Sequence, residues 1–265
     1  MKALITGASS GIGRELARLL VCRCDQLVLA ARNRERLEEL QAELSAKGTC
    51  QVTVVTTDVS DRESCVRLHA AHPDVDLLIN NAGFGDFGEF CETDLDKELR
   101  MIDTNIKGLH TLMKLYLPGM AARDRGQILN VASIAGFMPG PLMATYYATK
   151  AYVVRLSEAV RRELRARGSR VRVSILCPGP VKTNFEKTAN IGFQFNGAAP
   201  RKTAEYALAH LDRFYIVPGA SMRASRLAMK VLPTALTASA IYFLQSRRKS
   251  QTPPGGPAGE PSERG

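Results

Sequence analysis

Short apolar runs alternate with longer amphipathic stretches along most of the chain. The apolar runs are rich in β-branched residues and leucine, and they predict strands at residues 2–6, 26–30, 51–56, 75–79, 127–131 and 171–176, with a further one at 214–217. The stretches between them carry apolar residues at helical spacing and predict helices at residues 12–22, 34–47, 61–72, 94–121 and 145–167. Leu27-Val28-Leu29 and Leu77-Leu78-Ile79 are uninterrupted apolar runs, as expected of strands that are covered on both faces.

This order of elements predicts an α/β fold of the Rossmann type. We expect one domain, a doubly wound parallel sheet of about seven strands with helices on both faces. We assign residues 1–250 to this domain, including a C-terminal substrate lid and helical segment. Residues 251–265 are rich in proline and glycine and have almost nothing to bury, so we expect a disordered tail there.

A glycine-rich turn follows the first expected strand directly and leads into the first expected helix. Its sequence is Thr6-Gly7-Ala8-Ser9-Ser10-Gly11-Ile12-Gly13. Glycines let a backbone approach a pyrophosphate closely, and the free N–H groups of a helix N-terminus attract negative charge. A tight turn without a ligand would also explain three glycines, but their place at the start of a strand–helix unit favours a dinucleotide site.

The residues after the second strand indicate which dinucleotide is bound. An acidic residue there would accept hydrogen bonds from the adenosine ribose and repel a 2′-phosphate. The chain instead reads Leu29-Ala30-Ala31-Arg32, and a guanidinium can bind a phosphate through paired hydrogen bonds. We therefore expect NADP(H) rather than NAD(H). The alternative is that Arg32 is a solvated residue at the start of a helix.

Tyr146 and Lys150 are four residues apart and would project from one helix face. Ser133, at the end of an expected strand, precedes Tyr146 by thirteen residues. An ammonium about 4–5 Å from a phenol would lower the phenol pKa by about 2–3 units and make it an acid–base catalyst near neutral pH. Tyr147 is also within reach of Lys150, so the spacing alone does not select Tyr146.

The GxxxGxG spacing, the Asn80-Asn81-Ala82-Gly83 run after the fourth strand and the Tyr-x-x-x-Lys pair occur in an order that resembles the short-chain dehydrogenase/reductase family. The resemblance covers residues 2–185 and implies that Tyr146 exchanges a proton with the substrate, that Lys150 assists it and that Ser133 holds the substrate oxygen. It also implies a fourth catalytic residue, Asn105, within Asp103–Gly108. The implied cofactor contacts are Gly7, Ser9, Ser10, Gly11, Ile12, Gly13, Arg32, Asp58, Val59, Asn81, Ala82, Gly83, Tyr146, Lys150, Pro178, Gly179 and Val181.

Simpler interpretations remain open for three of these features. Asp58 could be the N-cap of the following helix, although Ser60 could serve there equally well. Asn80-Asn81-Ala82-Gly83 could be an ordinary turn after a strand. Asn105 could be an exposed polar residue of a helix.

The composition changes this picture little. The formal net charge is +10, but the basic residues are mixed with acidic ones, so solvated helix faces are favoured over an acidic partner, and nucleic acid is not expected.

The six cysteines contain no CxxC pair, and the four histidines have no metal-ligand spacing, so we expect free thiols and no metal site. The first residues leave no room for a secretory signal, which favours a cytoplasmic protein.

The substrate end is predicted only in outline. Residues 184–212 are expected to form a mobile lid, with apolar contacts from Phe185, Ile191, Phe193 and Phe195 and hinges at Gly192 and Gly197. Phe137, Met138, Leu142 and Met143 are expected to line the mouth of the site. Such walls suit an apolar or acyl-chain substrate.

Leu227–Leu244 is nearly apolar and contains Pro233. It is too short and interrupted for a membrane span, and packing on the protein or on a second subunit is favoured. The alternative is that residues 222–249 lie on a membrane surface, with the flanking arginines and lysines toward anionic lipid.

Together these features predict an NADP(H)-dependent oxidoreductase that transfers a hydride between the nicotinamide and a carbonyl or secondary alcohol. The resemblance also implies a homo-oligomer. The alternative function is a catalytically idle NADP(H)-binding sensor or scaffold at a membrane surface. The presence of both Tyr146 and Lys150 argues against that alternative.

Overall fold

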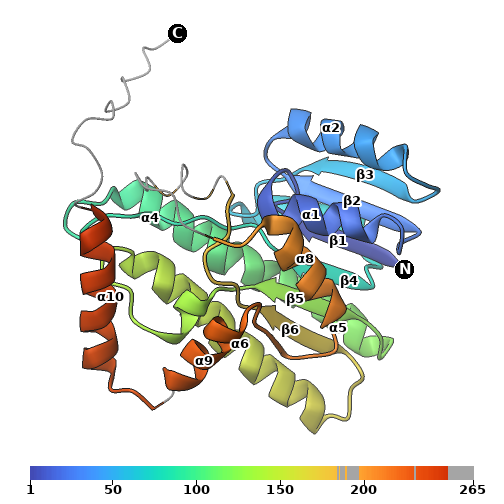
Figure 1. Ribbon diagram of the computed structural model, residues 1–265. Coiled ribbons are helices and arrows are strands. Elements are labelled where there is room, and N and C mark those ends of the chain that lie inside the picture. Colours follow the sequence, from blue (N-terminus) through green and yellow to red (C-terminus); the bar gives the residue numbers. More distant parts are fainter. Residues whose placement is uncertain (184, 186–188, 190–196, 230, 250–265) are drawn as a thin grey trace.

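The computed structural model describes residues 1–183, 185, 189, 197–229 and 231–249 (Figure 1). Within these residues one parallel sheet has the order β3-β2-β1-β4-β5-β6-β7. The strands are β1 (Lys2–Thr6), β2 (Gln26–Ala31), β3 (Gln51–Thr56), β4 (Leu77–Asn80), β5 (Gln127–Val131), β6 (Arg172–Leu176) and β7 (Tyr215–Ile216). The predicted Rossmann-type fold is therefore confirmed, and its strand order reverses between β1 and β4.

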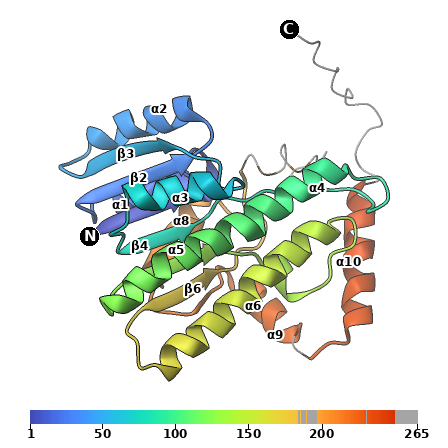
Figure 2. The same ribbon diagram turned by 180° about the vertical axis from the view of Figure 1, so that it is seen from behind.

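Helices cover both faces of the sheet. One face packs against α1 (Gly11–Leu20), α2 (Arg34–Ser45) and α8 (Pro200–Ala209) (Figure 1). The other packs against α3 (Arg62–Ala71), α5 (Leu109–Ala122) and α6 (Ala144–Ala166) (Figure 2). The central strands are apolar on both faces because both are covered, as the runs in β2 and β4 predicted.

The predicted helix at residues 94–121 is interrupted by a wider turn. The structure has α4 (Leu95–Ile102), a π-helical turn (Asp103–Gly108) and then α5. Apolar spacing hardly reveals this turn, because a single π turn adds only about one residue to the turn between two ordinary α-helical segments. Such π turns occur often at functional sites, and this one contains Asn105.

The prediction of a mobile lid at residues 184–212 is wrong for the last part of this range. Residues Pro200–Ala209 form helix α8, which packs on α1 and buries Ala204 and Ala207 in the core beside the sheet. The small alanine side chains let the two helices approach closely. Ile191, Gly192, Phe193 and Phe195 lie outside the described residues, as does the expected tail at residues 251–265.

The described residues end with two helices, α9 (Ala220–Ala228) and α10 (Thr234–Lys249), with Pro233 between them. Helix α10 stands beside the start of α6 (Figures 1 and 2). It buries the polar residues Thr237 and Gln245 and exposes apolar ones, among them Leu236 and Phe243. No described helix is long and apolar enough to cross a membrane.

Candidate active site

A cavity of about 540 Å³ lies along the carboxyl ends of the strands. Because these ends share one edge of a parallel sheet, residues from six strand ends meet there. Most of the residues expected to bind cofactor or substrate line this cavity: Gly7, Ser9, Ser10, Gly11, Ile12, Arg32, Asp58, Val59, Asn81, Ala82, Gly83, Ser133, Tyr146, Lys150, Pro178, Gly179 and Val181. Gly13 and Asn105 are not part of its wall.

The glycine turn has a shape that suits a pyrophosphate. Gly7 and Gly11 have φ angles of +65° and +55°, which side chains rarely adopt. Helix α1 begins at Gly11, its N-cap Ser10 makes no capping hydrogen bond through its side chain, and its first turn holds no acidic residue. The N–H groups at this helix end are therefore left for an anion. The residues present thus fit a bound dinucleotide.

Gly13 acts behind the wall of the cavity. A Cβ on Gly13 would lie 2.4 Å from the Gly7 carbonyl oxygen and 2.5 Å from Asn81 Nδ2. A side chain there would push α1 away from the turn. Gly13 thus allows close packing of the helix.

Thr6 and Asn81 hold the glycine turn against the loop after β4. Asn81 Nδ2 donates hydrogen bonds to the carbonyl oxygens of Thr6 (3.0 Å) and Gly7 (3.1 Å). The backbone N–H groups of Asn81 and Ala82 donate to Thr6 Oγ1, at 3.0 and 3.1 Å. The loop at Asn80-Asn81-Ala82-Gly83 is therefore more than a turn that ends a strand. Thr6 was not among the expected site residues, because its position directly before Gly7 is its only signal in the sequence.

Two arginines line the end of the cavity near β2 and α2. Arg32 is exposed directly after β2, and Arg36 follows four residues later, in the first turn of α2. Asn33 caps α2 by accepting a hydrogen bond from Arg36 N (2.8 Å). A smaller adjoining cavity is lined by Ser9, Ser10, Gly11, Arg14, Glu15, Arg36, Lys182, Thr183 and Pro200. Arg36 was not among the expected site residues, although it lines both cavities.

Asp58 is not a helix cap. The N-cap of α3 is Asp61, whose side chain accepts hydrogen bonds from the backbone of Glu63 and Ser64. Asp58 Oδ1 instead accepts from the backbone N–H and the hydroxyl of Ser60, at 2.9 and 2.7 Å. The capping interpretations of Asp58 and Ser60 are therefore wrong, and Asp58 lies in the cavity wall.

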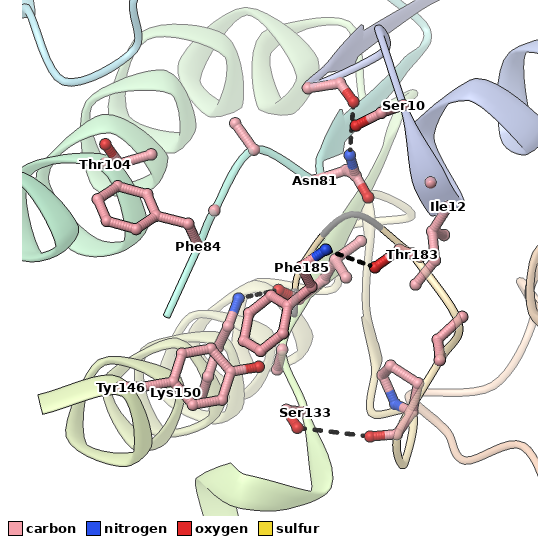
Figure 3. A pocket seen from close by; sticks show the side chains of 18 of the residues that line it. Ser10, Ile12, Asn81, Phe84, Thr104, Ser133, Tyr146, Lys150, Thr183 and Phe185 are labelled. Atoms are coloured by element: carbon pink, nitrogen blue, oxygen red, sulfur yellow. Dashed lines mark hydrogen bonds between the residues drawn. The ribbon is translucent and has the colours of Figure 1, made fainter. Parts of the chain in front are cut away.

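Ser133, Tyr146 and Lys150 lie together at the other end of the cavity (Figure 3). Lys150 Nζ donates a hydrogen bond to the Val131 carbonyl oxygen (2.9 Å) and lies 5.8 Å from the centre of the Tyr146 ring. Ser133 Oγ accepts from the N–H of Ala135 (3.2 Å) and faces the Pro178 carbonyl oxygen at 3.4 Å. Strand β5 and helix α6 thus bring together three residues that are up to seventeen positions apart.

The expected lowering of the Tyr146 pKa by Lys150 is wrong in this structure. Burial raises the pKa of Tyr146 to about 12, and a hydrogen bond with Ser133 opposes this only in part. Burial lowers the pKa of Lys150 to about 8. Each shift arises because the charged form loses its hydration. At neutral pH Tyr146 is therefore a neutral phenol, the form that can give a proton.

Asn105 is buried, at 2% exposure, so the interpretation as an exposed helix residue is wrong. Its Nδ2 donates to the Phe84 carbonyl oxygen (2.8 Å) and to Thr149 Oγ1 (3.0 Å), and its Oδ1 accepts from the Phe84 N–H (3.1 Å). A Cβ on Gly83 would lie 2.9 Å from Asn105 Oδ1 and 3.4 Å from Lys150 Nζ. Asn105 thus joins the loop after β4 to α6, next to Lys150.

The substrate end of the cavity is apolar and aromatic. Phe87, Met143, Tyr146, Tyr147 and Phe185 pack together there. The ring centres of Tyr146 and Phe185 are 5.2 Å apart.

Of the four residues expected at the mouth, Met143 alone lines the cavity. Phe137 packs on the ring of Tyr215 in β7, and Leu142 is buried in a left-handed conformation with φ of +65°. Met138 does not belong to the wall either. These three expectations were wrong because distance along the chain from Ser133 and Tyr146 does not determine which way a loop turns.

Gln245 of α10 also lines the cavity, and it was missed. Its Nε2 donates to the hydroxyl of Tyr147 (3.0 Å), ninety-eight residues earlier in the chain. A contact between such distant residues leaves no local signal in the sequence.

The model of the short chain dehydrogenase family matches residues 1–192. The chain belongs to the short-chain dehydrogenase family. It is 33% identical over 192 residues to an uncharacterized oxidoreductase of Staphylococcus epidermidis, covering 72% of this chain and 82% of that one. It is 32% identical over 198 residues to the very-long-chain 3-oxoacyl-CoA reductase of Anas platyrhynchos, covering 72% of this chain and 63% of that one.

Solved structures of the family share the fold over nearly the whole chain. A short-chain dehydrogenase from Sphingobium yanoikuyae in complex with NADPH has a TM-score of 0.77 and 27% identity, over 97% of this chain and 98% of that one. A short-chain dehydrogenase/reductase from Burkholderia phymatum in complex with NAD has a TM-score of 0.75 and 26% identity, over 97% of each. The chain is thus an oxidoreductase of a family whose members bind NADP(H) or NAD.

Proposed function

We propose that this short-chain dehydrogenase is an NADP(H)-dependent oxidoreductase acting on a carbonyl or secondary alcohol of an apolar or acyl-chain substrate. The observation that carries the proposal is one cavity wall that holds both the glycine turn and the group of Ser133, Tyr146 and Lys150. A protein that only bound a dinucleotide as a sensor or scaffold would have no need of this group.

The nicotinamide, when bound, would supply the hydride for reduction or accept it in oxidation. Tyr146, as a neutral phenol, gives its proton to the substrate oxygen. Ser133 hydrogen-bonds the same oxygen and stabilises the charge that develops on it. Lys150 places a positive charge beside this site from its position on the Val131 carbonyl. Asn105 is a positioning residue, because it holds Gly83 and Phe84 next to Lys150.

Arg32 and Arg36 support a preference for NADP(H) over NAD(H). Both line the adenosine end of the cavity and can donate paired hydrogen bonds to a phosphate. A complex with NADPH among the similar structures agrees with this preference, while a complex with NAD shows that the fold accepts both.

The apolar walls at Phe87, Met143 and Phe185 support an apolar substrate. The similarity to a reductase named for very-long-chain 3-oxoacyl-CoA points the same way, toward ketones that carry an acyl chain.

We also propose a cytoplasmic enzyme that lies on a membrane surface through residues 222–249 and forms a homo-oligomer through α4 and α5. Leu236, Phe243 and Leu244 of α10 are exposed, and basic residues flank them, which suits anionic lipid. Leu95, Leu99 and Ile102 of α4 are exposed as well and offer an apolar face to a second copy.

The test is a pair of variants of the two adjacent tyrosines. Tyr146→Phe removes the proton donor, so kcat/KM for NADPH-dependent ketone reduction should fall about 100- to 10,000-fold. Tyr147→Phe is the matched control. Its kcat/KM should fall far less, because the hydroxyl that it removes accepts a hydrogen bond from Gln245. Reduction assayed by NADPH absorbance that is as fast with Tyr146→Phe as with the parent enzyme would refute the proposal.

A further inference from the structure

The amide of Gln245 combines three features. Its side chain is only 7% exposed, it lines the large cavity, and it comes from α10, whose other inward residue is Thr237. An amide in such a place is costly unless both of its ends are hydrogen-bonded.

Only one end of this amide has a partner among the described residues. Nε2 donates to the hydroxyl of Tyr147 (3.0 Å), whereas Oε1 is buried without a partner. Thr237, by contrast, is satisfied within its own helix, because its hydroxyl donates to the Thr234 carbonyl oxygen (2.8 Å). The unsatisfied acceptor thus lies on the residue of α10 that lines the cavity.

The hydrogen bond to Tyr147 fixes the amide in place. A Cβ on Gly140 would lie 2.1 Å from the ring of Tyr147, so this ring rests directly on the glycine backbone. Tyr147 also packs edge-to-face on Tyr146, with ring centres 6.1 Å apart. The position of Gln245 is therefore tied, through one tyrosine, to the residue proposed to give the proton.

The surrounding walls make this acceptor selective. Phe87, Met143 and Phe185 line the same cavity as Gln245 and offer no strong hydrogen-bond donor, and the two tyrosines packed with them do not bond its amide oxygen in the described residues. A site with a buried acceptor favours a ligand that carries a donor over an analogue that lacks it.

We propose that Gln245 is a specificity-determining residue whose Oε1 accepts a hydrogen bond from a hydroxyl group that the ketone substrate carries at a distance from its reacting carbonyl. This inference rests on the proposed function and narrows its substrate class to apolar hydroxyketones.

The test uses matched pairs of ketones, ω-hydroxy-2-alkanones of about five to ten carbons and the 2-alkanones of equal length. The measured quantity is the ratio of kcat/KM with NADPH for the hydroxylated ketone to that for its parent. In the wild-type enzyme this ratio should peak at one chain length, where the hydroxyl reaches Oε1. Gln245→Met has a similar shape without hydrogen-bonding groups and should lower the peak ratio about 3- to 10-fold, the usual range for one neutral hydrogen bond.

Ser239→Ala is the control on the same helix, because Ser239 is exposed and its hydroxyl bonds only the Ala235 carbonyl of α10. It should leave the ratio as in the wild-type enzyme. The role of Gln245 would be overturned, with the reductase intact, if Gln245→Met left the ratio unchanged at every chain length. It would also be overturned if the variant lowered kcat/KM for both ketones of a pair in equal proportion. A wild-type enzyme that turns over neither member of any pair would overturn the proposed function, and this inference with it.

Discussion

Replacing Asn105 by alanine should destabilise the protein well beyond an ordinary helix substitution. The side chain makes three hydrogen bonds, two to the backbone of Phe84 and one to Thr149 Oγ1. Thr149 keeps a partner after the change, because its hydroxyl also donates to the Tyr146 carbonyl oxygen (2.7 Å). The N–H and the carbonyl of Phe84 are then left unsatisfied.

Each of these part-buried groups that loses its partner costs about 1–2 kcal/mol here, so the free energy of unfolding should fall by about 2–4 kcal/mol. In a domain of this size each kcal/mol lowers Tm by about 2–4 °C, which gives a decrease of about 5–15 °C. Thr149→Val removes one of the three hydrogen bonds and should cost about 1 kcal/mol. The double variant should be less destabilised than the sum of the two, by about 0.5–1.5 kcal/mol.

The assay is urea and thermal unfolding of the four proteins without cofactor, followed by circular dichroism. NADPH affinity, measured by fluorescence titration, should also fall with Asn105→Ala, because Gly83 lies between Asn105 and Lys150. Unfolding of Asn105→Ala within about 0.5 kcal/mol of the wild-type value, the range of neutral surface substitutions, would show that these hydrogen bonds do not hold the loop.

Three further predictions concern pH, cofactor choice and membranes. Reductive kcat/KM should be level near neutral pH and decline as pH rises through about 8, where Lys150 loses its proton while Tyr146, with a pKa of about 12, keeps its own. Lys150→Arg stays charged and should move that decline to higher pH; a decline that stays in place would contradict the assignment to Lys150. Arg32→Ala should lower kcat/KM for NADPH about 10- to 100-fold with little effect on NADH, as expected for charge-assisted hydrogen bonds to a phosphate, and a wild-type enzyme faster with NADH would exclude this reasoning. The wild-type protein should co-sediment with anionic phosphatidylserine vesicles more than with neutral ones, and replacing exposed Phe243 and Leu244 by serine should weaken this; equal sedimentation of both proteins would argue against a membrane role for α10.

The sequence alone determined the fold class and most of the candidate site. Strands and helices follow from local apolar periodicity, and the parallel topology follows from their alternation. The sequence therefore predicted the sheet edge at which the candidate residues meet. Gly7, Asp58, Asn81, Ser133 and Tyr146 all lie next to strand ends or at helical spacing, where local pattern determines position. Arg36, which reaches the cavity from α2, was not predicted.

Only the tertiary structure decided the electrostatics and the substrate end. The spacing of Tyr146 and Lys150 predicted a lowered phenol pKa, but burial, which depends on everything packed around the pair, raises it. Helix α8 became core rather than lid because of its packing on α1, and Gln245 entered the site because α10 meets α6 across ninety-eight residues. Desolvation and long-range contacts depend on how distant parts of the chain are placed in space, and no local pattern of residues records that placement.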